Sequence, residues 1–354
     1  MDRNNQPLAV STIVYNVILD SRVLALTNLS ESKRIEEQQK TFNALKEVFP
    51  DLDYAELEHG VQINPDTQAP YTDNNWKVLA RNVDKEIKEK LEAQNLKGIY
   101  FEKSTKRTYP LKTLAAHVIG FMRGDSKWGI ESYYDKYMTG TPGRSFISYD
   151  GNSTAVQMEY DAKDGDTVVT TLDYTIQQYA EEIVNETAAQ WPSEAVAIMV
   201  MNPNTGEVYA MADSGRFDLN NPDDPIALSD PAFAEAWNAM SEQEQIDYKN
   251  RMWNNFNVSS TYEPGSIFKP ITVAAALEEG IITQNQTFFC TGSVDVYEEN
   301  IRCHLRSGHG TLDVQGALAQ SCNPAMIEIA QKMGTETFYK YQRDFGFGER
   351  TGID

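Results

Sequence analysis

Hydrophobic and polar positions change their period several times along the first half of the chain. Residues 11–20 (STIVYNVILD) alternate as a half-buried strand does, whereas residues 32–49 and 82–95 carry charged residues along helical faces. Residues 145–173 hold short apolar runs separated by Asp-Gly pairs, which predict short strands joined by turns. We therefore predict a mixed, irregular first domain over residues 1–163, whose boundary falls inside this last stretch.

The pattern over residues 164–354 predicts a second domain of the α+β class. A strand at residues 166–171 leads to Asp173, an N-cap residue, and apolar positions then recur at helical spacing: Ile176, Ala180, Ile183, Val184 and Thr187. Two β-runs flank the NPNTG turn within residues 194–213, where Gly206 can take a positive φ. The order of strand, helix, hairpin and helix predicts an antiparallel sheet covered by helices.

Length and charge narrow the classes of partner. A chain of 354 residues is long for a single core, so two domains are expected. The formal net charge of −21 repels polyanions, which excludes nucleic acid as a partner and disfavours broad contact with an anionic lipid surface. Residues 8–26 are the best candidate for a membrane span, but Asp20 and Arg22 interrupt them, so neither a span nor a signal peptide is expected here.

One short stretch, STYEPGSIFKP, combines a rigid turn with a helix start and two reactive side chains. Pro264 and Gly265 turn the chain, and Pro270 is tolerated only in a first helical turn, so a helix should begin close to Ser266. Ser266 and Lys269 then share one face, where the amine can reach the hydroxyl. A serine nucleophile needs an adjacent base, and burial can lower the pKa of a lysine enough for that role. The free N–H groups of a helix start also stabilise an oxyanion.

The Ser-x-x-Lys spacing has little specificity by itself. About one such pair is expected by chance in a chain of this length, and Ser30 with Lys33 forms a second copy without the Pro-Gly turn. A second motif supports the first: Ser321 and Asn323 form the single Ser-x-Asn triplet of the chain, 55 residues after Ser266. The apolar spacing that follows places this triplet on a turn into a helix. There the hydroxyl and carboxamide either serve only as a cap or join a proton path and hold a substrate amide.

These motifs and their surroundings resemble a known family. YEPGSIFKP together with HGTLDVQGALAQSCNPAMIEIAQKMG looks like the first two active-site motifs of the class B penicillin-binding proteins, the peptidoglycan D,D-transpeptidases. DRNNQPLA resembles the start of the family's N-terminal domain, and KRTYPLKTLAAHVIGF and WGIESYYDKYMTGTPGR resemble its pedestal or dimerisation region. DGDTVVTTLDYTIQQYAEE and NPNTGEVYAMA resemble the start of its catalytic domain. The resemblance implies a pedestal over residues 1–163 and, over residues 164–354, the N-terminal part of a serine-β-lactamase-like transpeptidase domain.

Carried over residue by residue, the resemblance implies roles for the motif residues. Ser266 would be the acylated nucleophile and Lys269 its general base. Ser321 would relay protons to the leaving amine, and Asn323 would orient Lys269 and the donor peptide. In the pedestal, structural roles are implied for four family positions: Arg107, Gly120, Gly129 and Glu131. In the implied reaction the serine attacks the carbonyl between two terminal D-alanines of a stem peptide, and β-lactams trap the same serine.

The resemblance also implies partners and a location. Peptidoglycan stem peptides and β-lactams would bind at the serine, a membrane lipid-II polymerase would be a protein partner, and the N-terminal domain would support a homodimer. The protein would lie at the outer face of the cytoplasmic membrane, anchored by an N-terminal transmembrane helix that residues 1–354 do not include. The resemblance implies no cofactor.

One part of the family pattern is missing. Its third motif, K-[S/T]-G on a strand beside the nucleophile, does not occur in the sequence. The triplet RTG at residues 350–352 follows Asn323 by only 27 residues, and its surroundings, FGFGERTGID, match a different family loop. We therefore expect a piece of a longer protein that lacks about the second half of the catalytic domain.

The cysteines raise two further hypotheses. Cys290, Cys303, His304 and His309 form a C-x12-C-H-x4-H pattern, but its first pair lacks the two-to-four-residue spacing of structural zinc sites, so no metal is expected. A disulfide between Cys303 and Cys322 would clamp the catalytic cleft and couple activity to the redox state. The alternative for Cys322 is a small buried filler.

Two other functions share parts of this pattern. A β-lactamase or β-lactam sensor uses the same motifs, although the long pedestal is foreign to β-lactamases. An inactive scaffold for a lipid-II polymerase agrees with the missing third motif. Trp253 and Tyr262 are expected to be packing residues rather than contacts to the donor peptide.

Overall fold

The computed structural model describes residues 1–26, 28–72, 74–123, 126–149 and 155–353. It falls into two compact units, Met1–Ser259 and Ser260–Asp354. Each unit has hydrophobic core residues of its own, and each is described by itself. The predicted domain boundary after residue 163 lies inside the first unit and stays a prediction, because compactness and family domains need not divide a chain at the same place.

An antiparallel three-stranded sheet begins the first unit. Strand β1 (Val10–Asp20) lies between β2 (Trp76–Val83) and β3 (Ile99–Thr108). β1 confirms the strand predicted over residues 11–20. Its β-branched residues favour an extended, half-buried backbone, and the side chains of residues 16–19 are buried.

Four helices close the core of this sheet: α1 (Ser21–Leu24), α2 (Glu31–Val48), α3 (Tyr54–Gly60) and α4 (Lys85–Glu92). Phe42 and Leu45 of α2 pack with Val17 and Leu19 of β1. α2 confirms the helix predicted over residues 32–49. α4 is shorter than the predicted range, because the residues before its N-cap complete strand β2.

Short elements follow the sheet: α5 (Ala116–Ile119), β4 (Met122–Arg123), β5 (Ser126–Lys127), α6 (Gly129–Tyr133) and α7 (Asp135–Met138). Gly120 and Gly129 have positive φ angles of 67° and 62°. A Cβ on Gly120 would lie 1.9 Å from the carbonyl oxygen of Trp128, so the two chain segments approach too closely for a side chain. Glycine is required at this contact, in agreement with the structural role implied by the sequence.

Arg107 at the end of β3 forms a two-pronged ion pair with Glu131 of α6. Its Nη2 lies 2.7 Å from one carboxylate oxygen and its Nε lies 3.1 Å from the other. Its Nη1 also donates to Ser11 Oγ of β1 at 3.1 Å. Only 7% of the Glu131 surface is exposed, so the pair fixes α6 to the sheet with one partner almost fully removed from water.

Two antiparallel hairpins follow: β6 (Arg144–Tyr149) with β7 (Ala155–Tyr160), and β8 (Ala197–Met201) with β9 (Val208–Asp213). They confirm the strands predicted on both sides of the first Asp-Gly pair and of the NPNTG turn. Residues 150–151, which form that Asp-Gly pair, lie outside the described residues. Gly206 takes the positive φ predicted for it, at 78°.

The strand predicted at residues 166–171 is wrong. This segment bonds to isolated residues instead of a neighbouring strand. The Asp166 N–H donates to the Tyr137 carbonyl at 2.8 Å, the Met1 amino group donates to the Val168 carbonyl at 3.0 Å, and the Thr170 N–H donates to the Met1 carbonyl at 3.0 Å. Hydrogen bonds to separate residues hold an extended segment in place without making a ladder of paired strands.

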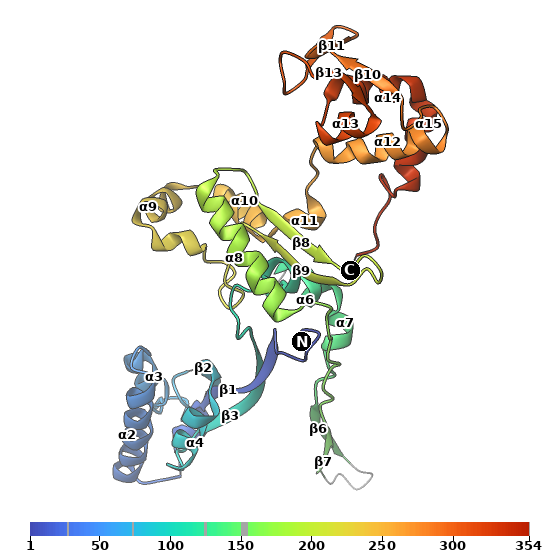
Figure 1. The fold of residues 1–354 in the computed structure, drawn as a ribbon. Coiled ribbons are helices and arrows are strands. Elements are labelled where there is room, and N and C mark those ends of the chain that lie inside the picture. The colour runs from blue at the N-terminus through green and yellow to red at the C-terminus, as the bar shows by residue number, and fades with distance from the viewer. Residues whose placement is uncertain (27, 73, 124–125, 150–154, 354) are drawn as a thin grey trace. The chain divides into compact units, whose positions relative to one another are not determined.

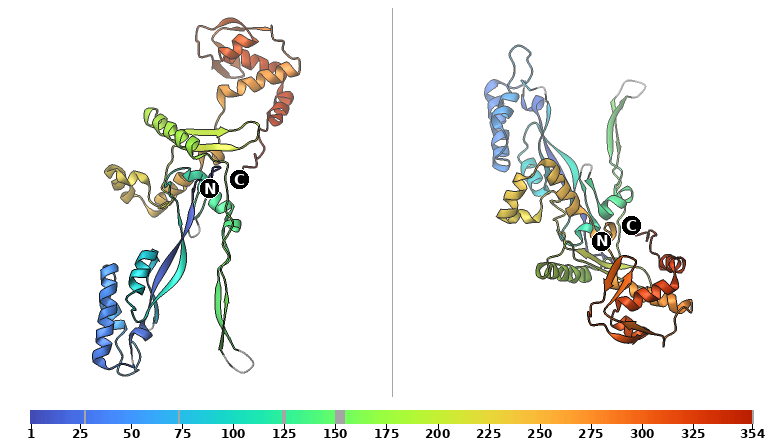
Figure 2. Two further views of the ribbon diagram at one scale, coloured as in Figure 1. Left: turned by 60° about the horizontal axis from the view of Figure 1, so that its bottom comes forward. Right: turned by 90° about the horizontal axis from the view of Figure 1, so that it is seen from above.

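Helix α8 (Tyr174–Gln190) lies along the β8–β9 hairpin (Figures 1 and 2). Asp173 caps it as predicted, accepting from two N–H groups of the first turn. Ile183, predicted to face the core, is 52% exposed. Gln177 is instead among the buried residues of α8. Its amide exchanges hydrogen bonds of 2.8 Å and 2.9 Å with the Met211 backbone of β9. A polar residue paired in this way is invisible to a search for apolar periodicity.

A helical insertion completes the first unit: η1 (Ile226–Ser229), α9 (Pro231–Ala239), α10 (Glu242–Trp253) and α11 (Phe256–Ser259). Ser241 and Glu244 form a capping box at the start of α10. Trp253 at its end is buried against Phe121, and its Nε1–H donates to the Pro222 carbonyl at 2.8 Å, so its predicted packing role is confirmed.

The second unit combines helices with two antiparallel strand pairs, β10–β13 and β11–β12 (Figure 1). Its elements are η2 (Gly265–Phe268), α12 (Lys269–Glu278), β10 (Thr287–Cys290), β11 (Ser293–Val296), β12 (Glu299–Arg302), β13 (Gly310–Asp313), α13 (Val314–Ala319), α14 (Asn323–Met333) and α15 (Thr335–Asp344). Phe288 and Ile329 lie in its core together with all three cysteines. Helices and antiparallel strands in both units confirm the predicted α+β class. Within the described ranges, no helix has the length and apolar character needed to cross a bilayer.

Candidate active site

Ser266 and Lys269 lie within one turn at the start of a helix. The chain enters through the 3₁₀ turn η2, which runs directly into α12. Gly265 has a φ of 59°, which bends the chain into this turn at no steric cost, and Pro270 lies in the first turn of α12. The helix therefore begins where the Pro-Gly and Pro positions predict, with a tighter first turn.

Ser321 and Asn323 lie on the turn between α13 and α14. Ser321 has a φ of 47°, in the left-handed region that residues with a Cβ rarely adopt. Its N–H donates to the Leu318 carbonyl at 3.0 Å, and the next N–H, of Cys322, donates to the Ala317 carbonyl at 2.9 Å. Such a backbone costs about 1–3 kcal/mol and persists because the surrounding structure holds it.

The four side chains are joined by one connected set of hydrogen bonds. Lys269 Nζ lies 2.9 Å from Ser321 Oγ, 2.9 Å from the Ser321 carbonyl oxygen and 2.6 Å from Asn323 Oδ1. Ser321 Oγ lies 3.1 Å from Ser266 Oγ. Within the described part of the chain, no direct hydrogen bond joins Lys269 Nζ to Ser266 Oγ. The hydrogen-bonded path from Lys269 Nζ to Ser266 Oγ therefore passes through the Ser321 hydroxyl.

The contacts of Lys269 fit a neutral amine as well as an ammonium. A neutral amine has two N–H donors and one lone pair. Its two donors match the Ser321 carbonyl and Asn323 Oδ1, which can only accept, and its lone pair matches the Ser321 hydroxyl, which can donate. Ser321 Oγ is then free to accept the proton of Ser266. The same atoms thus form a continuous donor–acceptor chain from the Ser266 hydroxyl to the Lys269 amine.

The surroundings of Lys269 favour that neutral form. Burial lowers the pKa of its amine below the usual value, because a partly buried ammonium loses hydration. Negative charge on Cys303 or Cys322 acts in the opposite direction and does not overcome the burial. Ser266 itself is exposed, so its hydroxyl is accessible from solvent.

The amide nitrogen of Asn323 is held by a residue that no sequence motif indicates. Asn323 Nδ2 donates to the Arg302 carbonyl at the end of β12, at 2.9 Å. A backbone carbonyl can be supplied by any residue type, so the sequence holds no signal for this contact. The amide orientation of Asn323 is set by both contacts, with Oδ1 toward Lys269 and Nδ2 toward β12.

Three further predictions are corrected or clarified. Cys303 and Cys322 do not form the proposed disulfide, and all three cysteines are free thiols. Tyr262 is 69% exposed, so its predicted packing role is wrong. The RTG triplet at residues 350–352 lies in an irregular, exposed segment rather than on a strand.

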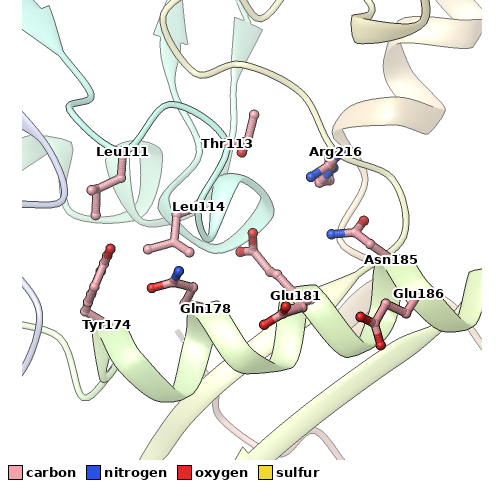
Figure 3. A pocket seen from close by; sticks show the side chains of 10 residues that line it. Leu111, Thr113, Leu114, Tyr174, Gln178, Glu181, Asn185, Glu186 and Arg216 are labelled. Carbon is pink, nitrogen blue, oxygen red and sulfur yellow. The ribbon is translucent and has the colours of Figure 1, made fainter.

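A hollow in the first unit is a second place to look for a binding site. It has a volume of about 460 Å³ and lies between α8 and residues 111–114 (Figure 3). Glu181 of α8 points into it and accepts hydrogen bonds from the Ala115 N–H at 2.6 Å and Gln177 Nε2 at 2.9 Å. Burial raises the pKa of Glu181, partly offset by these hydrogen bonds. The hollow holds no Ser-Lys pair of the kind found in the second unit, so we assign Glu181 a structural role.

Glu181 should make the stability of the chain depend on pH. Its pKa is higher in the folded chain than the unfolded value of 4.5, so its contribution is fully present below pH 4.5 and is lost as the pH rises through the folded pKa. Glu181→Gln keeps an acceptor oxygen for both donors and cannot ionise, so we expect this decline to disappear. The measurement is the unfolding free energy from urea titrations across the acid range. The exposed neighbour supplies the control: if Glu182→Gln flattens the profile equally, the assignment to Glu181 is wrong.

Known families match most of the chain. Residues 1–127 match the family described as "Penicillin-binding Protein dimerisation domain", and residues 196–354 match the "Penicillin binding protein transpeptidase domain". The predicted boundary after residue 163 lies between these two ranges.

Curated relatives and solved structures agree with these matches. Stage V sporulation protein D of Bacillus subtilis is 32% identical over 281 residues, covering 77% of this chain and 40% of the relative. The peptidoglycan D,D-transpeptidase FtsI of Escherichia coli K12 is 25% identical over 357 residues, covering 99% and 54%. A peptidoglycan synthetase from Bifidobacterium adolescentis has a TM-score of 0.64 at 25% identity, covering 100% of this chain and 62% of that one.

Another solved structure, of a penicillin-binding protein (PBP2) in complex with MreC from Helicobacter pylori, has a TM-score of 0.68 at 22% identity, covering 99% of this chain and 64% of that one. This last likeness concerns the fold alone. The chain spans about half the length of the curated relatives it matches.

Proposed function

This chain belongs to the class B penicillin-binding proteins, and we propose that the protein is a peptidoglycan D,D-transpeptidase that forms an acyl-enzyme on Ser266. The observation that carries the proposal is the hydrogen-bond path from Ser266 through Ser321 to Lys269. It supplies what a serine nucleophile needs, a base that can take its proton.

In the first step the Ser266 oxygen attacks the carbonyl carbon between the two terminal D-alanines of a stem peptide. As the new C–O bond forms, the Ser266 proton moves to Ser321 Oγ while the Ser321 proton moves to Lys269 Nζ. The C–N bond then breaks, and the proton returns from Lys269 through Ser321 to the departing amine of D-alanine. Asn323 keeps the lysine aligned throughout, because its Oδ1 accepts from Nζ in both protonation states.

In the second step the amine of a neighbouring strand attacks the acyl carbon. The new C–N bond forms as the C–O bond to Ser266 breaks, and a proton of the amine passes through Lys269 and Ser321 to the Ser266 oxygen. The same path serves this step in reverse. A β-lactam ring offers a strained amide to the same serine and leaves an acyl-enzyme that does not readily resolve. The N–H groups at the start of the Ser266 helix lie where they can contribute to an oxyanion site.

Partners and location follow from the substrate. Peptidoglycan lies outside the cytoplasmic membrane, so we propose that this site faces the outer side of that membrane. A lipid-II polymerase partner would supply the strands that the reaction joins, and the H. pylori relative solved with MreC supports the use of protein partners in this fold. Residues 1–127, which match a dimerisation domain, are the proposed surface for a homodimer.

A fluorescent penicillin tests the enzymatic proposal. We expect the protein expressed from its complete gene to be labelled stably, and Ser266→Ala to abolish the label. Ser30→Ala is the matched control, because Ser30 belongs to the other Ser-x-x-Lys pair and lies exposed at the start of α2; its labelling should equal that of the parent protein. Rapid release of the label would instead indicate a β-lactamase, and complete absence of label on the parent protein would indicate a scaffold.

A further inference from the structure

The short turn that carries Ser266 has little of its own to hold it in place. Residues 261–267 are all exposed, and a Cβ added to Gly265 would lie in open space. No side chain from the described part of the chain caps η2, and the hydrogen bonds of a 3₁₀ turn have poorer geometry than those of an α-helix. A contact outside the turn must therefore keep the Ser266 hydroxyl beside Ser321.

Phe268 ends this exposed run and supplies such a contact. Its ring centroid lies 5.7 Å from that of Phe338 in α15 and 5.1 Å from that of Phe347, with the ring planes inclined at 40° and 62°. Both distances fall in the range of attractive aromatic pairs. Phe268 stands between Ser266 and Lys269 in the sequence, so its anchoring restrains the backbone that joins them. We propose that Phe268, Phe338 and Phe347 form an aromatic clamp that positions Ser266 for acylation.

The end of α15 is built to direct Phe347 toward the turn. The Gly346 N–H donates to the Arg343 carbonyl at 2.7 Å, and the Phe347 N–H donates to the Gln342 carbonyl at 3.0 Å. These two bonds, with Gly346 at a φ of 83°, form the Schellman ending of a helix. The apolar residue that follows the glycine in such an ending commonly packs on its own helix, whereas the ring of Phe347 meets Phe268 of another element.

A second contact fixes α15 against α12. The two helices lie side by side (Figure 1). Tyr341 Oη donates to the carboxylate of Glu279, the C-cap residue of α12, at 2.8 Å, and Lys340 Nζ lies 3.8 Å from the same carboxylate. Phe338 and Tyr341 are three residues apart and so share one face of α15. This face thus contacts both the start and the end of α12, which gives the clamp a firm support.

The two phenylalanines of the FGFGERTGID stretch differ in their surroundings. Phe347 packs on Phe268 and is 39% exposed, whereas Phe345, on the other side of Gly346, is 54% exposed. The loop therefore offers two side chains of the same type, of which one belongs to the clamp. Phe347 is also accessible enough to be replaced without opening the core around Ile329.

The clamp acts on the reaction through the backbone of η2. Attack on a carbonyl needs the two reacting atoms aligned at about 3–3.5 Å, and the proposed proton path needs the 3.1 Å contact of Ser266 Oγ with Ser321 Oγ. A loosened turn would disturb both, while Lys269 would keep its contacts with Ser321 and Asn323. The three phenylalanines are thus positioning residues, and their effect on acylation rests on the proposed acyl-enzyme function.

Replacing Phe347 with alanine in the protein expressed from its complete gene tests the clamp. Labelling at several concentrations of fluorescent penicillin separates the binding constant of the drug from the first-order rate of acylation. We expect the acylation rate to fall by about 10- to 10²-fold, as a displacement of about 1 Å produces, and the binding constant to change by less than about threefold. The pH profile of the rate should keep its shape, because the contacts of Lys269 are unchanged.

Three further variants isolate the ring contact. Phe345→Ala is the matched control and should be acylated at the parent rate. Phe347→Tyr keeps the ring, and its hydroxyl can reach water at this partly exposed position, so it should also retain the parent rate. Phe268→Ala combined with Phe347→Ala should be no slower than Phe268→Ala alone, because the second change removes a contact that the first has already broken.

Hydrogen exchange gives a readout that needs no acylation. The Lys269 N–H donates to the Ser266 carbonyl, so its exchange reports how firmly η2 is held. Phe347→Ala should speed exchange at the start of α12 and leave α14 unchanged, and Phe345→Ala should alter neither helix.

The outcomes separate the clamp from the transpeptidase. Acylation and exchange in Phe347→Ala equal to those of the parent, or equal losses in Phe345→Ala and Phe347→Ala, would overturn the clamp. A parent protein that takes no label would contradict the transpeptidase. In that case faster exchange in Phe347→Ala alone would still support the clamp, and unchanged exchange would overturn it.

Discussion

Replacing Lys269 with alanine is expected to slow the acylation of Ser266 by a β-lactam about 10²–10⁴-fold. In the proposed proton path the amine is the terminal acceptor, so its removal would leave Ser321 with nowhere to pass the Ser266 proton. Lys269→Arg should be nearly as slow, because a guanidinium keeps the charge but cannot become neutral. The measurement is the rate of fluorescent-penicillin labelling of the protein expressed from its complete gene.

The same rate should depend on pH in a defined direction. Only the neutral amine accepts a proton, so labelling should rise as the pH increases through the pKa of Lys269, which burial places below the usual lysine value. Lys269→Ala should lack that rise. Lys332→Ala, which removes an exposed lysine paired with Glu328 in the same unit, is the control and should label normally. If the Lys269→Arg protein is labelled at a rate within a few-fold of the parent rate, Lys269 is not the base.

Replacing Glu131 with alanine is expected to lower the unfolding free energy of the chain by about 3 kcal/mol. The carboxylate is buried and its partner Arg107 would keep a charge without its counterion, while β3 would lose its link to α6. The expected loss lies at the low end for a buried pair, because the Arg107 side chain remains 34% exposed. Urea unfolding of the two proteins measures the difference.

An exposed pair in the same unit supplies the comparison. Lys46 and Glu58 lie 2.7 Å apart with side chains 45% and 46% exposed, so Glu58→Ala should cost no more than about 1 kcal/mol. Replacing Arg107 and Glu131 together with methionine and leucine should cost less than Glu131→Ala alone, since no unpaired charge remains. Equal losses for Glu131→Ala and Glu58→Ala would show that burial of the first pair contributes little.

Local signals in the sequence predicted elements wherever side-chain type and backbone geometry are directly coupled. The alternation over residues 11–20, the cap at Asp173 and the positive φ at Gly206 were all predicted from short stretches. Predictions failed where a distant partner decides the outcome. Residues 166–171 have strand composition but bond to isolated residues, Met1 and Tyr137, rather than to a strand. Ile183 has the helical spacing of a core residue but lies on an exposed face.

The candidate site shows the same division. The Pro-Gly turn and the proline at Pro270 determine that Ser266 and Lys269 share the first turn of a helix, because proline restricts φ wherever it occurs. The sequence also identified Ser321 and Asn323 as partners. It did not determine the route of the proton, since the direct contact expected between amine and nucleophile is replaced by a path through Ser321.

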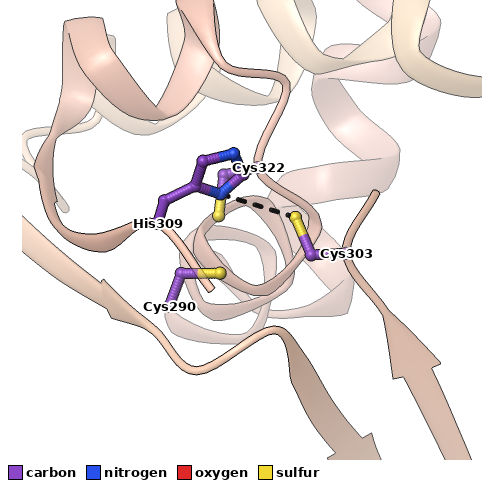
Figure 4. A group of neighbouring side chains, drawn as sticks. All are labelled: Cys290, Cys303, His309 and Cys322. Atoms are coloured by element: carbon purple, nitrogen blue, oxygen red, sulfur yellow. Dashed lines mark hydrogen bonds between the residues drawn. The ribbon is translucent and has the colours of Figure 1, made fainter. Parts of the chain in front are cut away.

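By itself, therefore, the sequence determined the residue types, the local backbone at the two motifs and the family to which they belong. Only the tertiary structure decided which atoms meet: Asn323 with the Arg302 carbonyl, Glu131 with Arg107, and Cys322 rather than His304 with the other cysteines. The physical reason is that spacing along the chain fixes contacts within a turn of helix or a hairpin, whereas contacts between distant segments depend on how their cores pack. The three cysteines span 33 positions of the sequence and lie around His309 (Figure 4) only because that packing brings their segments together.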